Sequence, residues 1–174
     1  MKVESPEFTE AEIDGFVTDY FEDERRGLIR RLEKIVEETD ALVPAIQGRE
    51  QTPDDSWSAV ETLAHMATTA QFFGWLVHEV VTKKEIDVDI VGMIKLRDIV
   101  TNDAADLPPK DLAGQVRQNI ERTIHFIKDV PYDDLRVRFQ YVGRELTAED
   151  VIRIPLSAHL ESHIRQMKAG LTSV

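Results

Sequence analysis

The stretch IPLSAHLESHIRQM, Ile154–Met167, places two histidines where a helix ordinarily carries core leucines. Residues on one helical face recur at steps of three or four, and here that stripe reads Ile152, Leu156, His159, His163 and Met167. The spacing predicts that both imidazoles lie on the core face of one helix. Burying two imidazoles on an apolar stripe is costly unless a partner satisfies their polar atoms.

The pair His159 and His163 has two interpretations. Neutral histidines in a core can hydrogen-bond to their neighbours, or a divalent metal ion can bind both rings, since i, i+4 spacing brings two rings to one ion. A zinc-protease motif is excluded because it needs Glu directly after the first His, whereas Leu160 stands there. Glu161 is expected to point to the far side of the helix.

His65 is the third candidate ligand and lies on another predicted helix. Three imidazoles with one open position describe a catalytic metal site, although spacing alone does not show whether His65 meets the pair. His125 shares its helical face with charged residues, so we expect it to be solvated. We expect His78 to pack at the core or its rim.

The composition describes a globular protein and excludes several classes of partner. The chain has 174 residues, a net charge of −12 and no cysteine. This acidity disfavours nucleic acids and anionic membrane surfaces, and the missing cysteine excludes disulfides and a thiol nucleophile of its own. The N-terminus lacks the apolar segment of a signal peptide. We therefore expect one domain over residues 1–174, soluble and cytoplasmic.

Helical periodicity predicts four long helices, and hence an all-α four-helix bundle. Thr9 and Glu12 have the spacing of a capping box at the start of the first helix. Its expected core stripe is Ile13, Phe16, Val17, Tyr20, Phe21, Leu28, Leu32, Ile35 and Val36. The basic run in the same helix is expected to form a solvated face and comprises Arg25, Arg26, Arg30 and Arg31.

The other three helices follow from similar patterns. The second is expected to be capped by Asp55 or Ser56, with a buried face of Val60, Leu63, Ala67, Ala70, Phe73 and Val77. Pro109 and Asp111 open the third, with the stripe Leu112, Val116, Ile120, Ile124 and Ile127. The fourth begins behind Thr147 and runs to about Gly170.

Long connections separate helices two and three, and helices three and four. The first of these connections is predicted to hold a short helix from Val91 to Val100. In the second, the alternation of Val137, Phe139 and Tyr141 predicts an extended, strand-like segment before Gly143. Long connections in small domains are usually functional or mobile.

Three motifs, taken in their order along the chain, resemble the DinB-like superfamily of four-helix-bundle proteins, also called the YfiT-like metal-dependent hydrolases. They are DDSWSAVETLAHM, GRELTAEDV and HLESHIRQM. Together they cover most of the chain. The residues that carry the resemblance are Trp57 and Ser58, His65 eight residues after Trp57, and His159, His163 and Gln166.

The resemblance implies that His65, His159 and His163 form a three-histidine metal site in an up-down-down-up bundle. It also implies a homodimer and a pocket with one open coordination position. Known activities in the superfamily are thiol transfer or isomerisation with a low-molecular-weight thiol such as bacillithiol or mycothiol. Pro155 departs from the usual residue at its position, which predicts a bend just before the ligands.

Three hypotheses follow. In the first, the protein is an enzyme that holds one divalent metal ion per chain, zinc or nickel. It would use a low-molecular-weight thiol or metal-bound water against a small electrophilic substrate, as a transferase or hydrolase. Trp57 and Tyr141 would then wall the pocket or pack in the core, and Glu61 would orient an imidazole or complement the helix dipole. In the second, the protein is a non-catalytic binding or stress-response module, and the three histidines join the second and fourth helices through a metal ion. In the third, they hydrogen-bond in a structural dimer without metal.

Overall fold

The computed structural model describes residues 8–46, 57–84 and 90–171. Its long helices are α1 (Glu10–Leu42), α2 (Ala59–Lys83) and α4 (Pro109–Asp129), with the shorter α3 (Ile90–Ala104) between the last two. The C-terminal helix is continuous and comprises α5 (Ala148–Val151), a π-helical segment (Ile152–Ala158) and α6 (His159–Leu171). Two 3-10 turns and a hairpin connect these helices: Val43–Ala45, Tyr132–Arg136, β1 (Arg138–Tyr141) and β2 (Arg144–Thr147).

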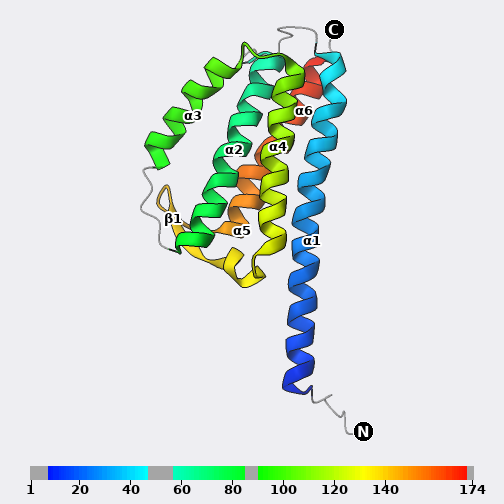
Figure 1. The fold of residues 1–174 in the computed structure, drawn as a ribbon, viewed down its shortest axis with the longest axis vertical. Coiled ribbons are helices and arrows are strands. Elements are labelled where there is room, and N and C mark those ends of the chain that lie inside the picture. Colours follow the sequence, from blue (N-terminus) through cyan, green and yellow to red (C-terminus); the bar gives the residue numbers. More distant parts are fainter. Residues whose placement is uncertain (1–7, 47–56, 85–89, 172–174) are drawn as a thin grey trace.

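The four long helices form the predicted bundle. Figure 1 shows α1 and the C-terminal helix running in one direction, α2 and α4 in the other, and α3 outside the bundle beside α2. This arrangement fits the up-down-down-up order. The expected short helix at Val91 to Val100 is present as part of α3. Among the described residues, no helix has both the length and the apolar character needed to cross a membrane.

Capping side chains set where the helices begin. Thr9 and Glu12 form the predicted capping box of α1, with the Thr9 N–H donating to the Glu12 carboxylate at 2.8 Å. The predicted caps of α2, Asp55 and Ser56, were wrong: α2 is capped by Ser58, and Asp55 and Ser56 lie outside the described residues. Ser58 is favoured because a glutamate stands three residues after it and completes the box.

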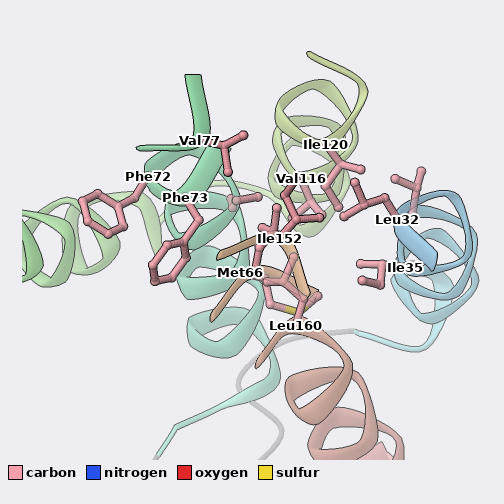
Figure 2. Packing of buried hydrophobic residues seen from close by; sticks show 14 of the residues in the cluster. Leu32, Ile35, Met66, Phe72, Phe73, Val77, Val116, Ile120, Ile152 and Leu160 are labelled. Atoms are coloured by element: carbon pink, nitrogen blue, oxygen red, sulfur yellow. The ribbon is translucent and has the colours of Figure 1, made fainter. Parts of the chain in front are cut away.

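The core lies where the bundle helices meet. Figure 2 shows Leu32 and Ile35 of α1 facing Val116 and Ile120 of α4, with Met66, Ile152 and Leu160 beside them. The predicted stripes of α2 and α4 are buried throughout. Large aliphatic side chains from all four helices therefore exclude water along the bundle axis, and their burial is the main stabilising contribution.

The first half of α1 does not pack in the core, contrary to prediction. Ile13, Phe16, Val17 and Tyr20 are exposed by 49%, 57%, 44% and 60%. Figure 1 shows this half of α1 extending beyond the other helices. The reason is length: α1 has 33 residues, against 25 in α2 and 21 in α4. Periodicity identifies the apolar side of a helix, but it does not show whether the neighbouring helices are long enough to cover it.

The segment before the last helix is a paired hairpin. β1 and β2 are antiparallel, with Phe139 opposite Leu146. Val142 and Gly143 form the turn with φ values of 49° and 74°, and positive φ at both positions matches the twist of a two-residue hairpin. The predicted extended segment is thus confirmed. Thr147 ends β2 and also caps α5, so the hairpin fixes where the C-terminal helix starts.

Candidate metal centre

The C-terminal helix changes its winding just before the histidines. Thr147 and Asp150 form the predicted cap, and the helix then widens to a π-helix over Ile152–Ala158. The N–H of His159 donates to the carbonyl of Ile154, five residues back. Pro155 lies inside this segment and has no N–H for the helical ladder. The bend expected at Pro155 stays a prediction, while the helical winding at Pro155 is π-helical.

This wider turn moves the histidines off the core stripe. After the π-helical segment the buried stripe is Leu160, Ile164 and Met167, while His159 and His163 are half-buried on the flank. The prediction that both imidazoles lie on the core face was therefore wrong. The prediction assumed 3.6 residues per turn along the whole helix, whereas the π-helical segment has more residues per turn. The shift turns both rings toward α2.

His65 of α2 meets this pair. Its side chain is 3% exposed, and its Nε2 lies 3.0 Å from Nε2 of His159. The same His159 atom lies 3.0 Å from Nε2 of His163. All three nitrogens lie within 4.8 Å of one another and could hold one metal ion. The hydroxyl oxygen Oγ1 of Thr69 also lies near this site, 3.3 Å from Nε2 of His65.

The three ring nitrogens are arranged better for binding one divalent cation than for hydrogen-bonding to one another. In the ring plane, Nε2 of His159 carries either one proton or one lone pair, yet it faces two ring nitrogens at 3.0 Å. One ion accepts the lone pairs of all three rings. Zinc–nitrogen bonds of about 2.0–2.1 Å in tetrahedral geometry place ligand nitrogens about 3.3–3.4 Å apart, close to the spacing here.

Gln166 orients one of the rings. Its Oε1 lies 3.0 Å from Nδ1 of His163, so Nδ1–H donates to the amide oxygen and the lone pair stays on Nε2, facing the other histidines. Such outer partners fix both the tautomer and the ring orientation of a ligand. The sequence contained a signal for this role, because Gln166 stands one turn after His163 on the same helix.

Trp57 lies against the site, whereas Tyr141 and Glu61 have other contacts. The Trp57 ring centre is 4.6 Å from that of His65 and 6.0 Å from that of His163, so the indole packs against the histidine group. The Tyr141 ring packs 6.5 Å from Phe73. The Glu61 carboxylate accepts from the N–H and hydroxyl of Ser58 at 2.7 Å, as expected of a first-turn glutamate at the positive end of a helix.

Arg31 connects the C-terminal helix to α1. Its Nε and Nη2 donate to both carboxylate oxygens of Glu161 at 2.6 and 2.7 Å, and its Nη1 donates to the carbonyl of Arg153 at 3.0 Å. This hydrogen-bonded guanidinium lowers the pKa of the Glu161 carboxyl. Glu161 thus pairs with α1 and is not in the group of three histidines. The pairing also crosslinks α1, the π-helical segment and α6.

The solvated face predicted for the arginine run was therefore wrong for two of its members. Arg25 is 9% exposed and donates to the carbonyls of Ile127 and Val130 at 2.5 and 2.8 Å, which closes the end of α4. Sequence reasoning missed Arg25 and Arg31 because their partners lie more than 100 residues away.

The two remaining histidines lie apart from the group of three. The His125 side chain is 82% exposed and pairs with Asp129 at 3.3 Å, as predicted for a solvated residue. The His78 side chain is 53% exposed, with its ring 4.9 Å from that of Phe126, which is the expected rim position. These positions make His125 a suitable control for experiments on the metal centre.

Comparison with known proteins identifies the family. Residues 20–167 match the DinB superfamily. This chain belongs to that superfamily. A histidine-to-alanine mutant of a mycothiol-dependent maleylpyruvate isomerase has a similar structure, with a TM-score of 0.67 and 14% identity over 83% of this chain and 61% of that one. At this identity the likeness shows the fold alone, and the DinB chain spans less than two thirds of the isomerase. No curated protein matches the sequence.

Proposed function

We propose that this DinB protein is a metal-dependent enzyme in which His65, His159 and His163 bind one divalent ion, zinc or nickel. It would use a low-molecular-weight thiol or water against a small electrophilic substrate, as a transferase or hydrolase. The convergence of three ring nitrogens within 4.8 Å carries the proposal. A cation on neutral imidazoles would make a bound thiol or water more acidic, and three protein ligands leave a position for it.

The chain's own residues support this chemistry by holding and sheltering the site. Gln166 keeps the lone pair of His163 on Nε2, and the Trp57 ring covers His65 and His163. Since the chain has no cysteine, a thiolate nucleophile would come from a cosubstrate. The similar isomerase is mycothiol-dependent, which makes a low-molecular-weight thiol the first cosubstrate to test.

The direct test mixes zinc- or nickel-loaded protein with glutathione or dithiothreitol and 1-chloro-2,4-dinitrobenzene. A second mixture omits the thiol and contains 4-nitrophenyl acetate, which reports hydrolysis. We expect product with at least one pair, loss of activity in His159→Ala, and retention in His125→Ala. Tight metal binding that stabilises the protein while both assays stay at background would contradict the enzyme proposal and favour the non-catalytic, metal-stapled module.

We also propose a homodimer that uses the apolar stripe on the first half of α1. Ile13, Phe16, Val17 and Tyr20 form a continuous exposed face, and such faces mark interaction sites. Light scattering after size exclusion tests this with Phe16→Asp, which we expect to be monomeric. Thr18→Asp adds the same charge at an exposed position on the opposite face and should remain dimeric. A monomeric wild type would contradict the proposal.

A further inference from the structure

We propose that an apolar groove between α2 and α3 binds the body of the electrophilic substrate, and that this substrate is uncharged and apolar or aromatic. The inference rests on the proposed function, because it specifies the substrate of the same site. The groove has a volume of about 310 Å³, within the range of pockets that bind small molecules.

The groove starts one helical turn from the candidate metal ligand on α2. Thr68 lines its near end, and the Thr68 hydroxyl donates to the carbonyl of His65 at 3.1 Å. Phe72 and Trp75 continue the lining at helical spacing. Helical rise places Thr68 about 4.5 Å and Trp75 about 15 Å beyond His65 along the axis. A molecule lying in the groove would therefore have its Thr68 end about one helical turn from His65 along the α2 axis.

The lining is apolar and, among the described residues, uncharged. Phe72, Trp75, Met93, Leu96 and Val100 provide most of its surface, and Thr68 and Gln71 are its polar members. The Thr68 hydroxyl lies 2.6 Å from that of Thr101 on α3, so this pair of hydroxyls joins the two helices.

A carboxylate or phosphate entering this groove would lose hydration, and the described lining residues offer it no cationic partner. The chain's net charge of −12 adds a repulsive field. An uncharged aromatic or aliphatic body loses no such hydration and gains burial against the same surface. The lining therefore selects against anionic electrophiles.

The residues at the rim have apolar surface that a ligand can cover. Trp75, Leu96 and Val100 are 37%, 57% and 41% exposed. Figure 2 shows Phe72 on the α3 side of α2, away from Leu32 and Ile120 in the bundle core. Covering this surface with a small apolar molecule removes it from water at a gain of about 25 cal/mol per Å².

Binding is tested separately from turnover with methyl 3-nitrobenzoate and its anion, 3-nitrobenzoate. Nitroaromatic rings quench tryptophan fluorescence, and Trp75 lines the groove. With metal-free protein, in which no zinc can bind the carboxylate, we expect the ester to bind at least tenfold more tightly than the anion. Leu96→Arg should weaken ester binding at least tenfold. Ile99→Arg, at a 59% exposed position on α3 that is not among the lining residues, should bind as wild type does.

The results separate this inference from the proposed function. Equal binding of ester and anion, or full ester binding by Leu96→Arg with its helix content retained, overturns the groove assignment. Turnover is then measured with methyl 4-chloro-3-nitrobenzoate and dithiothreitol. Ester binding with no turnover of this ester and background activity in both assays above supports the groove and contradicts the enzyme proposal. Turnover that Leu96→Arg leaves unchanged contradicts the groove alone.

Discussion

Replacing Gln166 with leucine tests how far the metal centre depends on ring orientation. The substitution removes the acceptor that lies 3.0 Å from Nδ1 of His163. A neutral hydrogen bond contributes about 1 kcal/mol net, which is about a fivefold change in affinity. The ring also loses the constraint that keeps its lone pair on Nε2, and losing such a partner weakens metal binding by about 10- to 100-fold. We therefore expect zinc affinity to fall by about 1.4–2.7 kcal/mol.

Competition with a fluorescent zinc chelator measures this affinity directly in tag-free protein. Gln166→Glu is the matched control, because its carboxylate can accept the same Nδ1–H and should bind zinc at least as tightly as wild type. Far-ultraviolet circular dichroism verifies that both variants keep their helices. Equal zinc affinity of Gln166→Leu and wild type would refute the reasoning that Gln166 orients a ligand.

Two further predictions concern packing and pH. A Cβ on Gly74 would lie 2.5 Å from Thr123 Oγ1 between α2 and α4, so Gly74→Ala should cost about 1–3 kcal/mol of unfolding free energy in urea. A Cβ on Gly27 would meet nothing within 4 Å, so Gly27→Ala should raise the unfolding free energy by about 0.5–1 kcal/mol. A Gly74→Ala variant as stable as wild type would contradict the close packing of α2 against α4 at Gly74. Arg31 lowers the pKa of the Glu161 carboxyl in the folded protein. The ion pair therefore stabilises the folded protein fully at pH values above the unfolded-state pKa of about 4.3. This stabilisation is lost as the pH falls through the lower pKa that Glu161 has in the folded protein. Metal-free wild type should exceed Glu161→Gln by about 1 kcal/mol at neutral pH, with the difference shrinking below about pH 4; a pH-independent difference would argue against the ion pair.

The sequence predicted the parts of the fold that depend on local patterns. Thr9 and Thr147 each stand three residues before an acidic side chain, and both cap helices as expected. The stripe from Leu112 to Ile127 is buried because α4 is short enough for its neighbours to cover it. Phe16 is exposed although it follows the same pattern, because its burial depends on how far the other helices extend.

Less of the candidate site could be predicted from the sequence, because it depends on tertiary structure. The pairing of His159 with His163 could be read from i, i+4 spacing, but the meeting with His65 came only from the resemblance to a family. Pro155 predicted a bend, and the sequence did not show that the helix would instead widen to a π-helix before the histidines. Arg31 was missed because Glu161 lies 130 residues away.

Metal content tests the central claim most directly. Tag-free wild type is compared by elemental analysis with His65→Ala, His159→Ala and His163→Ala, after incubation with zinc or nickel and removal of free ion. His125→Ala is the control, since its side chain is 82% exposed and outside the group of three. We predict about one ion per chain in wild type and in the control, and a loss in each of the other three variants, as expected for a three-ligand site. No bound ion in the wild type, or equal metal content in all five proteins, would contradict the metal centre.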